Sequence, residues 1–183
     1  MEYRAEAVYK EEDIVGFMKA YTFKDEKLRG MAKISRLCSR AAGVILLAAA
    51  AINTYAGIKG GVSGIKDLIP QGFMLLAGVL LLWLPVDDMA GKRTWRTYEG
   101  QGASIGFEFF PDHYDEMRQG NERPRNYGDI KGIYEDDERF YLFISEQSAD
   151  IIRKDSFTEG SADDFRAFIT EKTGLEPVMV TQA

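Results

Sequence analysis

The sequence has very few residues of the kinds that build metal sites and disulfide frameworks. Its 183 residues include one cysteine, Cys38, and one histidine, His113. A single cysteine excludes a disulfide framework and a thiolate zinc cluster, and a single histidine excludes a multi-histidine metal site. Five prolines and 18 glycines are too few for a collagen-like or disordered linker protein. The sequence therefore predicts a folded protein with no metal site and no cofactor.

An excess of basic charge is also missing. The chain has 23 basic and 29 acidic residues, a formal net charge of −6, and a pI near 5.0. Proteins that bind nucleic acid usually present a basic face, so we expect no nucleic-acid partner. The mean hydropathy of −0.25 describes, as an average, an acidic and soluble protein.

The apolar residues, however, are gathered in two runs without any charge. Residues 41–58 form an uncharged run of 18, and residues 68–86 form a second run of 19. As helices they would be roughly 27–29 Å long, close to the ~30 Å of the hydrocarbon core. The alternative is two buried helices of a soluble core, but soluble domains rarely supply two such runs nine residues apart. The sequence predicts transmembrane helices at 41–58 and 68–86, with an outer connector at 59–67.

Basic residues flank these runs on one side only. Nine lie just before the first run or just after the second, against two, Lys59 and Lys66, in the connector. Because basic flanks stay in the cytoplasm, we expect a multi-pass protein of the plasma membrane with both termini cytoplasmic. The nine flanking residues are Lys24, Lys27, Arg29, Lys33, Arg36, Arg40, Lys92, Arg93 and Arg96.

The acidic charge lies beyond the second run. Residues 1–40 have a net charge of +2, whereas residues 87–183 have twelve basic and 21 acidic groups, a net charge of −9. The acidic excess therefore belongs to the segment that is expected to face the cytoplasm.

The segments outside the runs have periodic patterns. Residues 1–40 predict an N-terminal strand over 2–9, then an amphipathic juxtamembrane helix that starts at the acidic residues 11–13. Residues 87–93, after Pro85, are expected to form a short linker. Residues 94–175 predict an antiparallel β domain, with strands over 103–110, 113–118, 139–145 and 149–154, a strand ending near Tyr134, and a loop over 120–124.

A helix closes this predicted domain. Ser161 and Asp164 have the spacing of a capping box, and Gly174 is placed to end the helix. Phe165, Phe168 and Ile169 form its apolar stripe. The fold class is therefore an α+β membrane protein, a two-helix transmembrane hairpin with a cytoplasmic antiparallel β domain closed by a C-terminal helix.

Three groups of residues carry a resemblance to a known family. They are Tyr9 with Glu12 and Asp13, the strand-turn FEFFPD at 107–112, and the stretch YGDIKGIYEDDERFYLFISEQSADIIRKDSF at 127–157. Together with the two-span hairpin, they resemble the YcxB-like family of bacterial membrane proteins over nearly the whole chain. The resemblance implies a membrane protein with a pleckstrin-homology-like cytoplasmic domain. It implies no established activity, so no functional residue is carried over.

Candidate chemical groups are few. His113 lies between acidic residues Asp112 and Asp115, but no nucleophile elbow accompanies it. Cys38 is expected to be a small packing residue, with reversible acylation as the alternative. The acidic residues 135–138 lack the EF-hand pattern that calcium binding would favour. The sequence thus assigns no catalytic, cofactor-binding or metal site residues.

These observations favour a membrane-anchored binding or regulatory module. Because its domain is acidic, we expect it to recognise protein or peptide rather than anionic lipid. The alternatives are an assembly subunit of a larger membrane complex and a membrane-associated enzyme that uses His113. The expected partners are the lipid bilayer and a protein, and small residues in the two runs allow a homo-oligomer.

Overall fold

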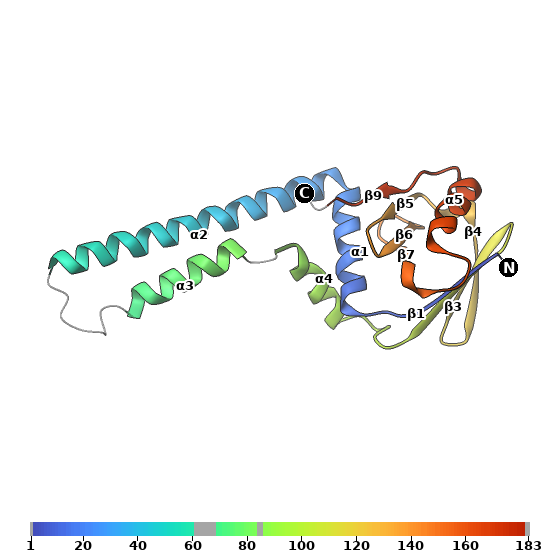
Figure 1. The fold of residues 1–183 in the computed structure, drawn as a ribbon, viewed down its shortest axis with the longest axis horizontal. Coiled ribbons are helices and arrows are strands. Elements are labelled where there is room, and N and C mark those ends of the chain that lie inside the picture. Colours follow the sequence, from blue (N-terminus) through green and yellow to red (C-terminus); the bar gives the residue numbers. More distant parts are fainter. Residues whose placement is uncertain (1, 61–68, 84–85, 182–183) are drawn as a thin grey trace. The chain divides into compact units, whose positions relative to one another are not determined.

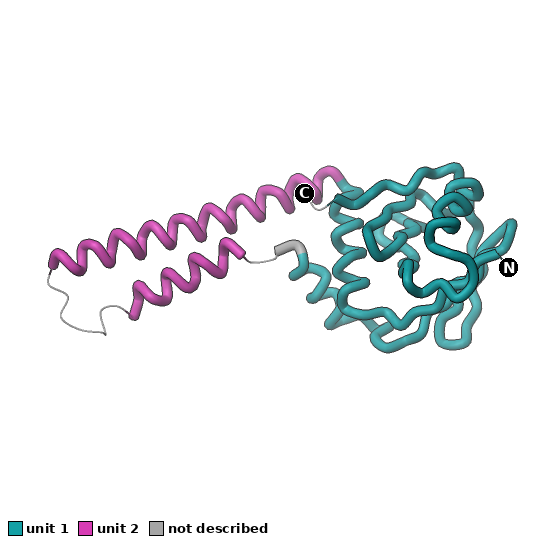
Figure 2. The backbone as a smooth tube through the Cα atoms, viewed as in Figure 1, with its two compact units in different colours: residues 1–25, 87–183 teal, residues 26–86 magenta. Residues whose placement is uncertain are grey.

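The chain folds into two compact units. The computed structural model describes residues 2–60, 69–83 and 86–181. Residues Met1–Asp25 and Asp87–Ala183 form one unit, here the sheet unit, and Glu26–Val86 form the other, here the helical unit (Figure 2). The boundaries differ from the expected segments 1–40 and 94–175. Residues 1–25 join the sheet unit because their apolar side chains lie in its core.

The helical unit consists of α2 (Glu26–Gly60) and α3 (Ile69–Trp83), which run antiparallel to each other (Figure 1). The helices approach closely at two glycines, where a Cβ on Gly43 would lie 2.8 Å from the carbonyl oxygen of Gly78. The predicted run 41–58 lies inside α2, which begins 15 residues earlier. Most of the predicted connector and the ends of the second run lie outside the described residues.

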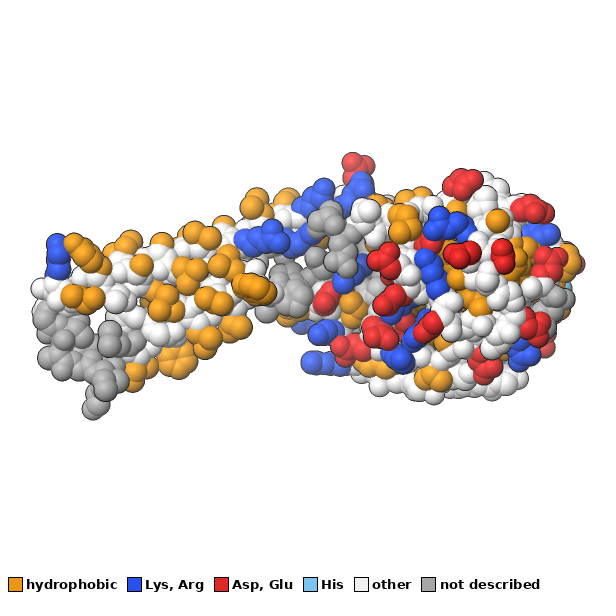
Figure 3. All heavy atoms as spheres, in the orientation of Figure 1, with side chains coloured by type: hydrophobic (Ala, Val, Ile, Leu, Met, Phe, Trp, Pro, Cys, Tyr) orange, Lys and Arg blue, Asp and Glu red, His pale blue; other side chains and the backbone are white. Residues whose placement is uncertain are grey.

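The apolar side chains of α2 point mainly to the outside. Ile45, Ile52 and Phe73 of α3 are 66–69% exposed, and only 11% of the most apolar window of α2 is buried. Hydrophobic side chains accordingly cover the visible face of the helical unit (Figure 3). By length and composition, the described residues contain one helix that can cross a membrane, or two if α3 and α4 count as one bent span. Cys38 is exposed on α2.

The sheet unit contains two antiparallel meanders. Sheet A has the order β4-β3-β2-β1-β8, and sheet B the order β7-β6-β5-β9. The strands of sheet A are β1 (Tyr3–Val8), β2 (Ser104–Phe109), β3 (His113–Arg118), β4 (Asn121–Asn126) and β8 (Phe157–Glu159). Those of sheet B are β5 (Gly132–Glu135), β6 (Arg139–Phe143), β7 (Ala149–Arg153) and β9 (Val178–Met179), with short 3-10 helices η2 (Tyr127–Asp129) and η3 (Lys154–Ser156).

One predicted loop is a strand. Residues 120–124 were expected to be a loop because they contain Pro124 and three charged or amide residues, but they form most of β4. The prediction was wrong because β4 is the outer strand of sheet A, where Pro124 opposite Asp115 does not break the sheet. The other predicted strands lie within one or two residues of their expected ends.

The core lies between the two sheets and under α5 (Ala162–Thr173). Phe165 of α5 packs its ring 4.7 Å from that of Phe109 and 5.4 Å from that of Phe140, joining the helix to both sheets. The predicted cap is confirmed, since Ser161 Oγ accepts the N–H of Asp164. Gly174 ends the helix with a φ of 69°, in the left-handed region that glycine adopts without strain. A mixed α+β fold with antiparallel sheets and a closing helix is thus confirmed.

Two helices of the sheet unit lie between β1 and β2 in the sequence. They are α1 (Glu11–Lys24) and α4 (Val86–Arg96), and α4 replaces the linker expected over 87–93. Gly91 explains the difference, because a Cβ there would lie 2.5 Å from the Cα of Val15, so only glycine lets α4 lie directly on α1. An ion pair of 2.8 Å joins Lys19 to Asp88. The whole helical unit is therefore an insertion in the β1–β2 connection.

Candidate functional site

The lone histidine is the first residue of β3, directly after the tight turn that follows β2. His113 Nδ1 is 2.8 Å from a carboxylate oxygen of Asp112, and its Nε2 is 3.7 Å from Asp115. Its ring stacks on that of Phe110, with centroids 4.9 Å apart. The hydrogen bond with His113 lowers the pKa of the exposed Asp112 carboxyl. The three residues named for the enzyme alternative thus do meet, and their contacts hold this turn together.

The acidic residues 135–138 are held by groups of the chain itself. Glu135 is buried, and its Oε1 accepts hydrogen bonds from Lys154 and Arg166. Asp136 Oδ1 accepts the backbone N–H of Glu138 at 2.8 Å. Among the residues that the structure describes, no group of three His, Cys, Asp or Glu side chains could hold a metal ion. The calcium alternative therefore has no support in this arrangement.

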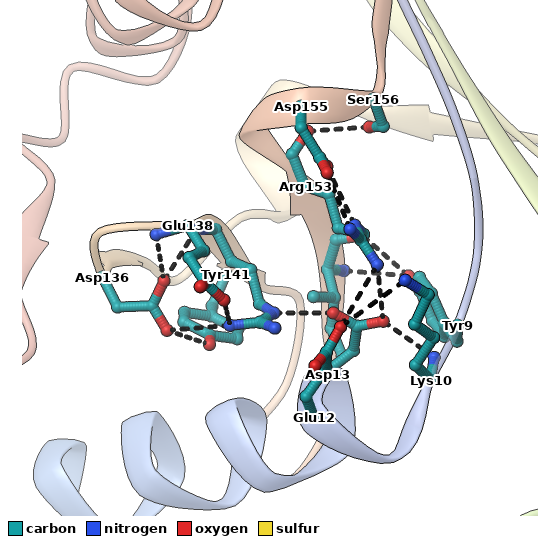
Figure 4. A network of polar contacts seen from close by, with 12 residues as sticks. Tyr9, Lys10, Glu12, Asp13, Asp136, Glu138, Tyr141, Arg153, Asp155 and Ser156 are labelled. Carbon is teal, nitrogen blue, oxygen red and sulfur yellow. Dashed lines mark hydrogen bonds and ion pairs between the residues drawn. The ribbon is translucent and has the colours of Figure 1, made fainter.

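A buried network of charges joins the start of α1 to sheet B (Figure 4). Its centre is Asp13, whose side chain is fully buried at the third position of α1. One carboxylate oxygen accepts from Arg139 Nε at 2.6 Å, and the other accepts the backbone N–H of Lys10 at 2.8 Å. Arg153 Nη1 lies 3.7 Å from the same carboxylate. Asp13 therefore caps α1 and attaches it to β6 and β7 at once.

Arg139 is the second member of the network, and it is equally enclosed. Its side chain is 7% exposed and lies 2.7 Å from Glu138 and 3.7 Å from Asp136, in addition to Asp13. Burial alone would lower the pKa of this guanidinium, but the hydrogen bond with Asp13 and the charges of Asp13, Asp136 and Tyr141 together outweigh it and raise the pKa above its usual value. Asp136 also accepts the Tyr141 hydroxyl at 2.5 Å. The positive charge of Arg139, the first residue of β6, is thus balanced by the carboxylates of Asp13, Asp136 and Glu138.

A tyrosine completes the attachment just before α1. The hydroxyl of Tyr9 donates to the carbonyl oxygen of Ile151 at 2.8 Å and accepts the N–H of Ile151 at 3.2 Å. Burial raises the pKa of this hydroxyl well above its usual value, so it stays protonated as a donor. Because β7 is the outer strand of sheet B, Tyr9 also satisfies a backbone pair that would otherwise lack a strand partner. We call Tyr9, Asp13, Arg139 and Arg153 the α1 clamp.

The α1 clamp is the arrangement in the sheet unit best placed to act on the rest of the chain. It fixes α1, and α1 continues into α2 after the single residue Asp25. The side chains of the clamp are engaged with one another in ion pairs and hydrogen bonds, so they are suited to holding α1 against sheet B.

A second buried polar pair joins the two sheets. The hydroxyl of Tyr114 on β3 donates to Asp150 Oδ2 on β7 at 2.8 Å, and both residues are buried. Burial raises the pKa of the Asp150 carboxyl to about 6, although the hydrogen bond from Tyr114 acts in the opposite direction. Among the surrounding charges, the carboxylate of Glu116 raises the pKa of Asp150 further, and the guanidinium of Arg125 lowers it.

Asp150 is expected to make the protein more stable in mild acid. An aspartate in an unfolded chain titrates near pH ~3.9, so the folded chain binds this proton at a higher pH than the unfolded chain. This contribution is complete below pH ~4 and is lost as the pH rises through about 6. Relative to Asp150→Asn, the unfolding free energy should rise by on the order of 1 kcal/mol between pH 7.5 and pH 5. Thermal or urea unfolding of the full chain in detergent at both values measures it.

A matched control is Asp155→Asn. The hydrogen bond from Arg153 lowers the pKa of the exposed Asp155 carboxyl, so its stabilising effect is lost only below pH ~4 and should stay unchanged between pH 7.5 and pH 5. Equal pH dependence of the unaltered chain and the Asp150→Asn variant would contradict the prediction.

The comparisons with known proteins agree with part of this picture. Residues 109–169 match the model of the family described as YcxB-like protein. This range runs from the end of β2 through all of β5, β6 and β7 to most of α5. Residues 109–169, here the YcxB-like region, are thus similar to the YcxB-like family. The suspected resemblance is therefore confirmed for this YcxB-like region, which contains Arg139, Arg153 and Asp150.

The family match covers a shorter part of the chain than the resemblance in the sequence suggested. Tyr9, Asp13 and the two apolar runs lie outside the YcxB-like region, although the resemblance was read over nearly the whole chain. Neither the curated proteins nor the solved structures contain a significant match to the chain.

Sequence reasoning did not identify the α1 clamp or the Tyr114–Asp150 pair as sites. Asp13 was read as one of three acidic residues at a helix start, and Asp150 as an ordinary residue of a hairpin strand. The sequence does contain one sign of these sites, a charged residue in an otherwise apolar strand. Asp150 lies within ADIIR, and Arg139 is the first residue of RFYLF. Buried charges of this kind are paired, but the sequence does not show with which residue.

Proposed function

We propose that the chain is a membrane-anchored binding module. The helical unit anchors it in the plasma membrane as a two-span hairpin of α2 and α3, with both termini in the cytoplasm. The sheet unit, which includes the YcxB-like region, recognises a protein or peptide. The observation that carries the proposal is the exposure of large apolar side chains along α2, because a soluble chain would lose stability by leaving them in water.

The packing of α3 on α2 supports a hairpin. Close approach at Gly43 and Gly78 is typical of helix pairs in lipid, where small residues allow backbone contact. The hydroxyl of Ser39 donates to the carbonyl oxygen of Leu81 at 3.0 Å, which adds a polar contact between the helices. Two helices joined by a short connector return the chain to the side from which it started, so both termini would lie together.

Charge supports both the orientation and the kind of partner. The helical unit has seven basic and two acidic residues, a net charge of +5, and five of the basic residues lie in the first 15 residues of α2. The sheet unit has 16 basic and 27 acidic residues, a net charge of −11. Basic residues beside a span favour the cytoplasmic side, whereas so acidic a domain is repelled by anionic headgroups. Protein or peptide is therefore the favoured partner.

A pleckstrin-homology-like fold of the sheet unit forms part of the proposal. The support is the order of its elements, with the β1–β4 meander, then the β5–β7 meander, then the covering helix α5.

Membrane fractionation with topology reporters tests the anchor. The full chain is expected to stay in the membrane pellet after alkaline carbonate washing. Reporter fusions at either end should report a cytoplasmic location, and a fusion in the connector at residue 63 should report the outer side. A chain without residues 26–86 serves as the matched control and should leave the pellet. Release of the full chain by carbonate, or ends on opposite sides, would contradict the proposal.

A further inference from the structure

The outer edge of β5 holds a very short strand. In sheet B, β9 follows α5 in the sequence and pairs with β5 in parallel, through the partners Tyr134–Val178 and Glu135–Met179. The N–H of Val180 donates to the carbonyl oxygen of Glu135 at 2.7 Å. We call residues 176–181 the β9 segment; its residues 178–180 lie along a strand edge of the YcxB-like region.

The contacts of the β9 segment are few. The side chains of Val178 and Met179 are 46% and 43% exposed, and Val180 is the residue of the segment that packs against the core. The segment pairs with Tyr134 and Glu135, two of the four residues of β5. The other two residues of β5, Gly132 and Ile133, have no strand partner from β9. An extended segment with this little burial is replaceable by another of the same form.

Two outer strands, β7 and β4, are less suited to accept a further strand. On β7, the N–H and carbonyl of Ile151 are already bonded to the Tyr9 hydroxyl. On β4, Pro124 lacks an N–H, and charged side chains surround it. Both devices are common protections of sheet edges against strand addition. The β5 edge has neither, and it is the edge along which an extended segment already lies.

We propose that the β5 edge is the docking site for an extended segment of a partner protein, which takes the place of the β9 segment. The inference rests on the proposed recognition of protein or peptide, and it assigns that recognition to one edge. Backbone hydrogen bonds to β5 supply most of the affinity, as in other strand additions. The partner segment carries an apolar, β-branched side chain where Val180 now lies, and its paired positions need no charge, as in the sequence PVMV of residues 177–180.

The β9 segment then acts as a competitor within the chain. A tethered segment has an effective local concentration of the order of millimolar, so a free peptide of similar affinity cannot displace it at micromolar concentration. A partner gains access only if it binds β5 more tightly or is itself concentrated at the membrane.

A labelled peptide of residues 175–181 is the direct probe. It is titrated by fluorescence anisotropy against three detergent-solubilised proteins: the unaltered full chain, a chain that ends at Leu175, and the full-length variant Val180→Pro. The last variant removes the N–H that bonds Glu135. We expect saturable binding to the second and third proteins, at least ten-fold tighter than to the first. Val178→Thr, at an exposed position, is the matched control and should behave like the unaltered chain.

Two results would overturn the proposal. One is that the peptide shows no saturable binding to the Val180→Pro variant although the thermal unfolding of that variant remains cooperative. This result would count against the proposal even if the chain that ends at Leu175 fails to fold. The other is equal peptide affinity for the unaltered and altered chains. Neither result concerns membrane insertion, so carbonate fractionation of the same proteins shows separately whether the membrane-anchored module survives.

Discussion

A chain in which residues 26–86 are replaced by a short glycine–serine linker is expected to fold as a water-soluble domain, whereas the fragment 94–183 is expected to stay unfolded. The first protein keeps the whole sheet unit, and the second loses β1 and α1. In sheet A, β1 lies between β2 and β8, so its removal leaves β8 without a partner strand and exposes one edge of β2. The same removal takes Ala5, Tyr9, Ile14 and Ala20 out of the core.

The size of the effect follows from this burial. Each large buried side chain contributes about 1.5–3 kcal/mol, and a domain of this size is stable by only about 5–15 kcal/mol in total. Losing Tyr9 and Ile14 together with β1, an inner strand of sheet A, therefore removes most or all of the stability. The fragment should show no cooperative thermal transition by circular dichroism, while the linked protein should show one.

The linker is short because α1 and α4 run side by side. Lys19 is paired with Asp88, and Gly91 lies on Val15. Asp25 lies six residues beyond Lys19, which is about 9 Å at the rise of an α-helix. A linker of roughly six residues reaches about 20 Å and closes this distance without strain. A cooperative transition in the fragment 94–183, or aggregation of the linked protein, would contradict the prediction.

The linked protein also tests the lipid part of the proposed function. With a net charge of −11 on the sheet unit, it should sediment no more with phosphatidylglycerol vesicles than with phosphatidylcholine vesicles. Preferential sedimentation with the anionic vesicles would show that lipid, and not protein, is the better partner.

Breaking the α1 clamp is expected to have the second-largest effect. Asp13→Leu or Arg139→Met leaves the other charge of a buried pair without its closest partner, and such changes cost about 3–5 kcal/mol. The lower end of this range applies because Arg139 keeps Glu138, and Asp13 keeps the N–H of Lys10. Urea unfolding of the linked protein should show the loss as a lower midpoint with an unchanged slope.

The double variant distinguishes pairing from simple loss of side chains. Asp13→Leu with Arg139→Met removes both charges, so it should recover part of the stability that either single change loses. Glu138→Gln is the control, since Glu138 is 71% exposed and its contact with Arg139 should be worth less than about 1 kcal/mol. Additive losses in the double variant would show that Asp13 and Arg139 do not act as a pair.

Local patterns predicted most of the elements correctly because their causes are local. The Ser161 cap and the Gly174 stop depend on residues within one helical turn, and both lie where the sequence places them. The strands over 104–109, 113–118, 139–143 and 149–153 likewise lie within two residues of the ranges that their local patterns predict. The errors occurred where a tertiary neighbour decides. Pro124 is tolerated because β4 is an outer strand, and residues 87–93 are helical because Gly91 lies on α1.

By itself, the sequence determined the two apolar runs, the distribution of charge, the α+β character and the resemblance that the YcxB-like region confirms. These are properties of composition and short-range periodicity. Only the tertiary structure decided that residues 1–25 belong with 87–183, that Asp13 is bonded to Arg139, and that residues 176–181 lie on β5. Each of these contacts joins residues more than 40 positions apart. Their partners are selected by the burial of apolar surface and the pairing of buried charge, and neither is encoded by spacing along the chain.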